Sequence, residues 1–170
     1  MDTSWIHWFD MARLKSPQKE VVAGLTVGGK RFAVVVSRFN SAITEALLSG
    51  AVDCFKWHGV AESSIDIIYV PGSLEIPVAA AKLAETKKYA ALVALGAVIR
   101  GDTYHFEVVA NHSTSALVEL SVRQKIPIAY GILTVENLRQ AKARAGGKEG
   151  NKGWEAAKTA LQMADLMEKL

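Results

Sequence analysis

The sequence has little of several features that mark common classes of protein, and each shortage narrows what the chain can be. Among 170 residues only Cys54 is a cysteine, so no disulfide forms within the chain and we expect a reducing, cytoplasmic compartment. No apolar run reaches the roughly 20 residues of a membrane span, so we expect no membrane association. The formal net charge is only +3, and basic residues form no stripe interleaved with aromatic ones, which argues against a nucleic-acid partner.

Several catalytic motifs are also missing. The chain has no G-x-S-x-G elbow for a nucleophilic serine, and no lysine at the end of a buried strand for Schiff-base chemistry. His105-Phe106-Glu107 resembles the start of a zinc deaminase motif, but no later C-x-x-C completes that metal site. An enzyme with this sequence would therefore work by positioning and proton transfer, without a metal, a nucleotide or a covalent nucleophile.

The glycine-rich segment 146–153 lacks the spacing of a phosphate-binding loop and follows a helical pattern instead of a strand. We interpret it as the end of a helix at Arg144, with Gly146 or Gly147 as the C-cap glycine, and then a turn into the last helix.

Four apolar, β-branched segments alternate with segments in which apolar residues recur at helical spacing. The expected strands are 31–36, 65–70, 91–99 and 126–133. The expected buried helix residues are Ile43, Leu47, Ala51, Cys54, Phe55, Ile76, Ala80, Leu83, Ala156, Ala157, Ala160, Leu161, Ala164 and Met167. Strand–helix alternation gives right-handed crossovers and a parallel sheet covered on both faces. We predict one flavodoxin-like α/β domain, a three-layer α/β/α sandwich with a four-stranded parallel sheet.

Polar and aromatic residues follow each expected strand, in segments 37–40, 71–75, 100–105 and 134–137. Because parallel strands end at the same edge of a sheet, we expect Phe39, Glu75, His105 and the backbone amides near Gly72 and Gly101 to converge. Apolar walls with a few fixed polar groups are typical of a small-molecule pocket.

The segment 97–106 is the most informative of these. An apolar strand turns polar at Gly101, and a helix is expected to start at about Thr103. Turn amides that lead into a helix N-terminus suit an anion such as phosphate, and His105 can donate or accept a proton near neutral pH. Taken alone, the segment also allows a plain helix cap at Asp102 or Thr103 with a surface histidine beside it.

Four motifs, in their order and spacing, resemble those of the lumazine synthase family. They are the segments 38–40, 71–77, 96–106 and 144–153. The resemblance implies an enzymatic domain over 30–170 that follows an N-terminal extension over 1–29. It also implies a cofactor-free condensation of 5-amino-6-(D-ribitylamino)uracil with 3,4-dihydroxy-2-butanone 4-phosphate. The product would be 6,7-dimethyl-8-ribityllumazine, with release of phosphate and water, in the penultimate step of riboflavin biosynthesis.

The same resemblance implies roles for individual residues, and no metal. His105 would move protons during catalysis. The residues implied to bind ribitylaminouracil are Phe39, Asn40, Ser73, Leu74, Glu75, Ala97, Val98, Ile99 and Tyr130. The residues implied to hold the phosphate are Gly101, Asp102, Thr103, Arg144 and Lys152. Tyr130 and Arg144 would reach the site from an adjacent subunit.

The resemblance further implies a homopentamer with active sites between adjacent subunits. The short turn over 146–153 is similar to that of members that close into an icosahedral shell of sixty subunits, for which riboflavin synthase is a further expected partner. Two features depart from the family pattern: Leu74 replaces a common aromatic, and the extension before Lys30 is long, with an aromatic cluster at 5–9. The alternative interpretation is a non-catalytic paralogue that binds lumazine or flavin, or only builds a shell.

Overall fold

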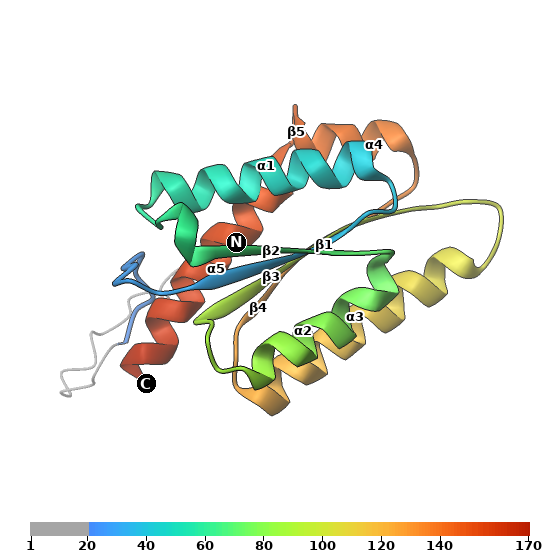
Figure 1. Ribbon diagram of the computed structural model, residues 1–170. Helices are drawn as coiled ribbons and strands as arrows, with labels where there is room; N and C mark the ends of the chain where they lie inside the picture. The colour runs from blue at the N-terminus through green and yellow to red at the C-terminus, as the bar shows by residue number, and fades with distance from the viewer. Residues whose placement is uncertain (1–20) are drawn as a thin grey trace, which may run out of the picture.

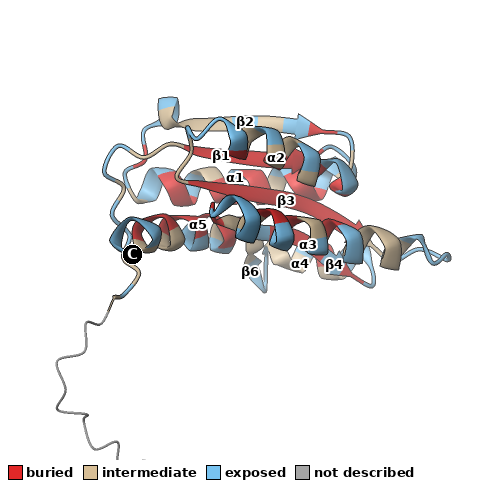
Figure 2. Cartoon of the chain, turned by 90° about the horizontal axis from the view of Figure 1, so that it is seen from below, coloured by how far each residue is buried: buried red, intermediate tan, exposed pale blue. Residues whose placement is uncertain are grey.

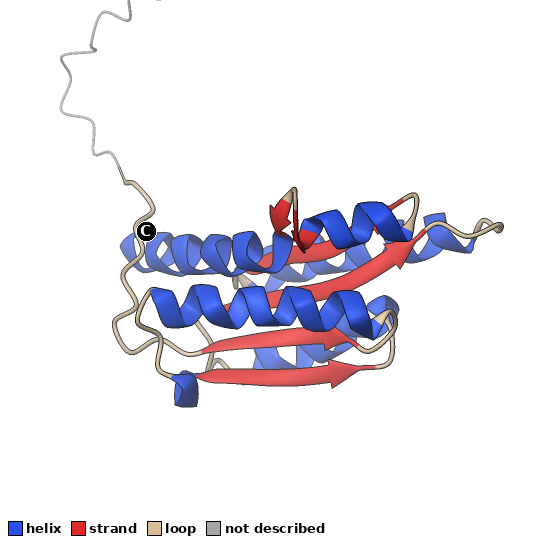
Figure 3. Cartoon of the chain, turned by 90° about the horizontal axis from the view of Figure 1, so that it is seen from above, coloured by secondary structure: helices blue, strands red, loops and turns tan. Residues whose placement is uncertain are grey.

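A computed structural model describes residues 21–170 and has a parallel sheet between two layers of helices (Figure 1). The strands are β1 (Phe32–Ser37), β2 (Ile65–Val70), β3 (Ala91–Ile99) and β4 (Ile128–Val135), in the order β2-β1-β3-β4. All neighbouring pairs are parallel, so their carboxyl ends share one edge of the sheet (Figure 3). The prediction of a four-stranded parallel sheet is confirmed, with strand ends that differ from the expected ones by at most two residues.

The two central strands are buried because helices cover both of their faces (Figure 2). Every residue of β1 is buried, as are the first eight residues of β3. Both strands consist mainly of alanine and branched aliphatic residues, the composition of parallel strands without a solvent face. The edge strand β2 leaves Ile67 and Tyr69 exposed.

Helices α1 (Ser41–Trp57), α4 (Leu138–Arg144) and α5 (Lys152–Lys169) cover one face of the sheet, and α2 (Ile76–Glu85) and α3 (His105–Gln124) cover the other (Figure 1). Two short 3-10 helices, η2 (Glu62–Ser64) and η3 (Ser73–Glu75), flank β2. This is the predicted three-layer α/β/α arrangement. Most of the expected helix core is buried, but Leu83 is only partly buried and Met167 is 39% exposed. The expectation for Met167 was wrong because residues 167–170, the end of α5, are all exposed.

Two local expectations also change. Helix α3 begins at His105, two residues after the predicted start at about Thr103, and its N-cap is Tyr104. No side chain caps it, so the alternative interpretation as a plain cap at Asp102 or Thr103 was wrong. Residues 101–104 form an exposed loop instead. Helix α4 ends at Arg144 as predicted, but its C-cap is Ala145, and Gly146 follows with φ +102°. Where a simple turn was expected, the structure has a small antiparallel hairpin of β5 (Ala145–Gly147) and β6 (Gly150–Asn151).

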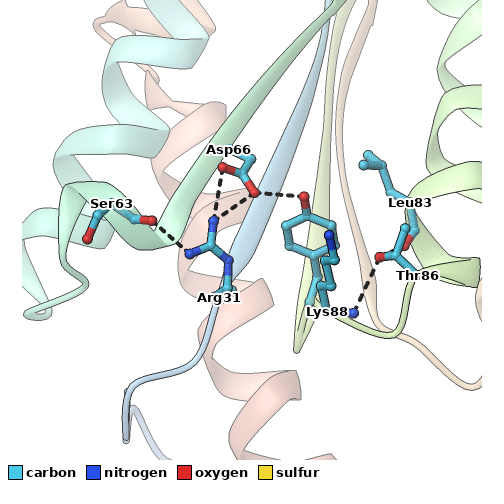
Figure 4. A network of polar contacts seen from close by, with 7 residues as sticks. Arg31, Ser63, Asp66, Leu83, Thr86 and Lys88 are labelled. Atoms are coloured by element: carbon cyan, nitrogen blue, oxygen red, sulfur yellow. Dashed lines mark hydrogen bonds and ion pairs between the residues drawn. The ribbon is translucent and has the colours of Figure 1, made fainter.

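A polar network joins the strands near the end opposite to their carboxyl ends (Figure 4). Arg31 donates two hydrogen bonds to the carboxylate of Asp66, at 2.9 and 3.1 Å, and another to the carbonyl oxygen of Ser63. The hydroxyl of Tyr89 donates to the same carboxylate at 2.7 Å. These bonds hold the pKa of the Asp66 carboxyl below its usual value, the bond from Tyr89 first and that from Arg31 next.

Two sequence-based expectations concern other parts of the chain. In residues 21–170, none of the helices is both long enough and apolar enough to span a bilayer. The aromatic cluster at 5–9 lies outside the described residues, as does most of the predicted extension over 1–29.

Candidate active site

A cavity of about 440 Å³ lies at the carboxyl edge of the sheet, where the loops after β1, β2 and β3 meet. Its lining is mainly apolar, with one carboxylate, one imidazole and two hydroxyls among its side chains. The lining residues are Phe39, Gly72, Ser73, Leu74, Glu75, Ala97, Val98, Ile99, Gly101, Thr103, His105, Phe106 and Val109. The expected convergence of Phe39, Glu75 and His105 with the turns at Gly72 and Gly101 is therefore present in the structure.

Phe39 stands at the mouth of this cavity on a loop that is fixed from two sides. The ring residue itself is 70% exposed. Its backbone amide donates to the carbonyl oxygen of Pro71 at 3.1 Å, which ties the loop after β1 to the loop after β2. The next residue, Asn40, has φ 58° and donates its side-chain amide to the carbonyl oxygen of Ala97 at 2.8 Å. Asn40 does not line the cavity, so its side chain serves to hold the loop.

The loop after β2 approaches β3 closely at Gly96. A Cβ atom at position 96 would lie 2.6 Å from the hydroxyl oxygen of Ser73 and 3.1 Å from Ile132, so a side chain there would force both neighbours to move. Ser73 is buried, whereas Leu74 is 40% exposed and presents an aliphatic surface to the cavity. The glycine thus lets η3 place Ser73, Leu74 and Glu75 against the wall formed by β3.

The third side of the cavity is the end of β3 and the start of α3. Ala97 and Val98 are buried wall residues, and the exposed loop 101–104 follows them. His105 is the first residue of α3, a helix of 20 residues, and its side chain lines the cavity. Backbone amides at the start of a long helix favour an anion, because they have no partner within the helix and lie at the positive end of its dipole.

An ion-pair cluster sits beside this loop and was not anticipated from the sequence. The Arg100 side chain donates to Glu107 on α3, and to Glu136 after β4 at 2.7 Å. Its guanidinium carbon also lies 4.2 Å from the centre of the Phe106 ring. The bond from Arg100 holds the pKa of the Glu107 carboxyl below its usual value, and both carboxylates raise the pKa of Arg100.

In addition to Asn40, four of the site residues implied by the sequence motifs do not line the cavity of this chain. Asp102 belongs to the exposed loop but does not line the cavity. Tyr130 on β4 is 40% exposed and accepts a hydrogen bond from the hydroxyl of Thr114 at 2.8 Å. Arg144 ends α4 and donates to the carbonyl oxygen of Gln140, and Lys152 pairs with Glu155 at 2.6 Å.

Sequence reasoning also missed Phe106 and Val109, which line the cavity from α3. They lie one and four residues after His105, so helical spacing from the histidine could have indicated them. Within the described range, 21–170, no group of three or more histidine, cysteine, aspartate or glutamate side chains is placed to hold a metal ion.

Comparison with known proteins matches the sequence of this chain to one enzyme family. A family model described as 6,7-dimethyl-8-ribityllumazine synthase matches residues 29–168. A protein of that name from Kosmotoga olearia is 49% identical over 142 residues, which cover 84% of this chain and 91% of the relative. Another of that name, from Chlorobium luteolum, is 48% identical over 148 residues, which cover 87% of this chain and 96% of the relative.

Proposed function

Because the chain belongs to the 6,7-dimethyl-8-ribityllumazine synthase family, we propose that the cavity at the sheet edge is where it carries out that synthesis. The enzyme condenses 5-amino-6-(D-ribitylamino)uracil with 3,4-dihydroxy-2-butanone 4-phosphate. The observation that carries the assignment of the site is the meeting of Phe39, Glu75, His105 and the loop at Gly101 around one cavity.

The reaction needs orientation and proton transfer more than it needs a strong electrophile. The amine of the pyrimidine attacks the ketone and water leaves to give an imine, phosphate is then eliminated, and ring closure with loss of water gives the lumazine. Holding two reactants together contributes roughly 7–11 kcal/mol in favourable cases. His105 lines the cavity, where its imidazole can carry protons between the amine, the carbon skeleton and the leaving oxygen.

The apolar half of the cavity suits the pyrimidine. The exposed ring of Phe39 stacks on the flat heterocycle, and Ala97, Val98 and Ile99 form the wall on its other side. Ser73 and Glu75 supply polar contacts to the ribityl chain and the ring edge, while Leu74 supplies only aliphatic contact. Asn40 contributes by fixing the Phe39 loop through its bond to Ala97.

The polar half of the cavity suits the phosphate. Gly101, Asp102 and Thr103 precede the N-terminus of α3 and offer backbone amides and a hydroxyl to the anion. Arg144 adds positive charge from the adjacent subunit, and arginine binds phosphate well through two parallel hydrogen bonds. Lys152 adds a second positive charge to the phosphate side. The placement of Tyr130 and Arg144 outside this chain's own cavity supports a site that two subunits share.

The assembly that follows is a homopentamer, closed further into an icosahedral shell that can associate with riboflavin synthase. The hairpin over 145–151 is short, as in the shell-forming members that the motif resembles. Residues 1–29 form an extension to the enzymatic domain over 30–170, in keeping with a family match that begins at residue 29. The single cysteine, which is buried, supports a cytoplasmic location.

Subunit mixing tests the shared site. Phe39→Asp spoils the pocket of its own chain, whereas Arg144→Ala removes the group given to the neighbour. The two inactive variants, unfolded and reassembled together in equal amounts, regain activity in about one quarter of the sites, because random mixing creates that share of intact interfaces. No recovery from a well-formed mixed oligomer contradicts the shared site. Activity is read as lumazine absorbance and as phosphate released, in equal amounts.

A non-catalytic paralogue is the second candidate, and Leu74 is the only feature in its favour. His105 in the cavity argues against it.

A further inference from the structure

The loop that carries the proposed phosphate-binding residues makes very few hydrogen bonds of its own. Residues 101–105 are all exposed, and the loop projects beyond the carboxyl edge of the sheet before α3 returns beneath it (Figure 1). In the described part of the chain, the side chains of residues 101–106 form no hydrogen bond. Its main-chain closure consists of the amides of Glu107 and Val108, which donate to the carbonyl oxygen of Tyr104 at 3.1 and 3.4 Å.

Arg100 closes the base of this loop from the strand side. Its backbone amide donates to the carbonyl oxygen of Val135 at 2.9 Å, which extends the β3–β4 pairing by one residue. Its side chain then reaches Glu107 on the first turn of α3 and Glu136 after β4. One guanidinium therefore connects the end of β3, the start of α3 and the end of β4.

The environment of Glu107 makes this connection hard to replace. One carboxylate oxygen accepts a hydrogen bond from Arg100, while the other, Oε2, is buried and accepts none from any residue in 21–170. Loss of Arg100 would leave a carboxylate without its charged donor beside His105 and Phe106. The Glu107 side chain is 29% exposed, so water replaces part of the lost contact, but water does not tie α3 to the end of β3.

Arg100 does not line the cavity, so it does not contact the substrates from its observed position. We infer that Arg100 is a positioning residue. Through its ion pairs with Glu107 and Glu136, it fixes the position of the loop 101–104 and of His105 relative to the pyrimidine side of the site. This inference rests on the proposed function. The pyrimidine side is fixed by other contacts, namely those of Phe39 with Pro71 and of Asn40 with Ala97, and it does not depend on Arg100.

Because the phosphate side and the pyrimidine side of the site have separate supports, replacing Arg100 is expected to affect the two substrates differently. Arg100→Gln raises the KM for the butanone phosphate by about tenfold and lowers kcat, since a small misplacement of reacting groups can cost up to about 10²-fold in rate. The KM for the pyrimidine stays within about twofold of its original value, because Phe39 and the β3 wall keep their supports. Arg100→Lys gives an intermediate result, because an ammonium group lacks the planar fork that serves two carboxylates at once.

The matched control is Arg123→Gln, which removes an arginine from an exposed ion pair with Glu119 at the far end of the same helix. It leaves both KM values unchanged. Unchanged constants for Arg100→Gln, or an equal rise of both KM values, overturn the inference. If Arg100→Gln does not fold, Arg100→Lys and Glu136→Gln decide by the same criteria.

Hydrogen exchange provides a second readout that needs no activity. In Arg100→Gln the amides of Glu107 and Val108 exchange at least about tenfold faster than in the unaltered protein, while amides near Arg123 do not change. Equal exchange rates of these two amides in the variant and in the unaltered protein would overturn the positioning role of Arg100. If the unaltered protein makes no lumazine, the proposed function fails, and the exchange rates still decide whether Arg100 holds the loop.

Discussion

The side-chain amide of Asn40 donates a 2.8 Å hydrogen bond to the carbonyl oxygen of Ala97. The bond joins the loop after β1 to the cavity wall on β3, across 57 positions of sequence. Asn40 also has φ 58°, a left-handed conformation that asparagine tolerates better than most residues. The two properties together explain why an asparagine follows Phe39 at this position.

The effect of replacing Asn40 follows from these properties. Asn40→Gly keeps the backbone conformation and removes the side chain with its amide, so we expect a loss of about 1 kcal/mol in the free energy of unfolding. Asn40→Asp is more harmful, because a carboxylate would face the carbonyl oxygen of Ala97. Urea unfolding at fixed protein concentration measures both. Equal stability of the glycine variant and the unaltered protein would show that the bond contributes nothing.

His105→Ala tests proton transfer in the proposed site. We expect turnover to fall, by up to about 10²-fold, without being abolished, because proximity still contributes when the proton carrier is gone. Steady-state kinetics with both substrates provides the measurement. His112→Ala, on the same helix but outside the cavity lining, is the matched control. An unchanged rate for His105→Ala would remove this histidine from the mechanism.

The Asp66 network predicts a pH dependence of stability. The hydrogen bonds from Tyr89 and Arg31 lower the pKa of Asp66 in the folded state. The stabilisation is therefore complete above the unfolded pKa of about 3.9, and it is lost as pH falls through the lower folded value. Because Asp66 is partly exposed, the gain is at most about 1 kcal/mol.

Asp66→Asn measures that gain. The difference in unfolding free energy between the unaltered protein and the variant is largest near neutral pH and shrinks toward pH 2. Asp53→Asn, an exposed carboxylate on α1, is the control and shows a smaller difference at pH 7. A difference for Asp66→Asn that stays constant with pH would mean that ionisation of Asp66 does not contribute.

Asn151 is expected to matter more than an ordinary helix cap. Its side-chain oxygen accepts hydrogen bonds from the amides of Gly153 and Trp154, and its side-chain nitrogen donates to the carbonyl oxygen of Ala46 on α1. Asn151→Ala therefore loses a cap and a link between two helices, about 2 kcal/mol in all. Asn137→Ala loses only the cap of α4, about 1 kcal/mol. Thermal unfolding compares the two, and an equal loss would show that the link to Ala46 adds nothing.

Removal of residues 1–20 is expected to change assembly more than turnover, because the cavity is built from residues 39–109. Light scattering reports the size of the particle, and the lumazine assay reports activity. If particle size stays the same after truncation, the extension has no part in assembly.

The strands could be predicted because they are β-branched segments that alternate with helical patterns. The convergence of the loops could be predicted because parallel strands place their carboxyl-terminal loops at one edge of the sheet. The ion pairs of Arg100 could not be predicted, because the partners lie 7 and 36 residues away in the sequence and only folding brings Glu136 to Arg100. The β5–β6 hairpin was missed because a glycine-rich segment carries no strand pattern. Gly147 fits there because a Cβ would lie 2.7 Å from the carbonyl oxygen of Lys142.

Whether this chain forms a lumazine is measured most directly by mixing the purified full-length protein with the ribitylaminouracil and the butanone phosphate. Lumazine formation is followed by absorbance beside the same mixture without protein, because the two substrates also react slowly on their own. We expect a clear rate enhancement that falls in the His105→Ala variant. No enhancement from a well-folded oligomer would contradict it and would favour a paralogue that only binds or assembles.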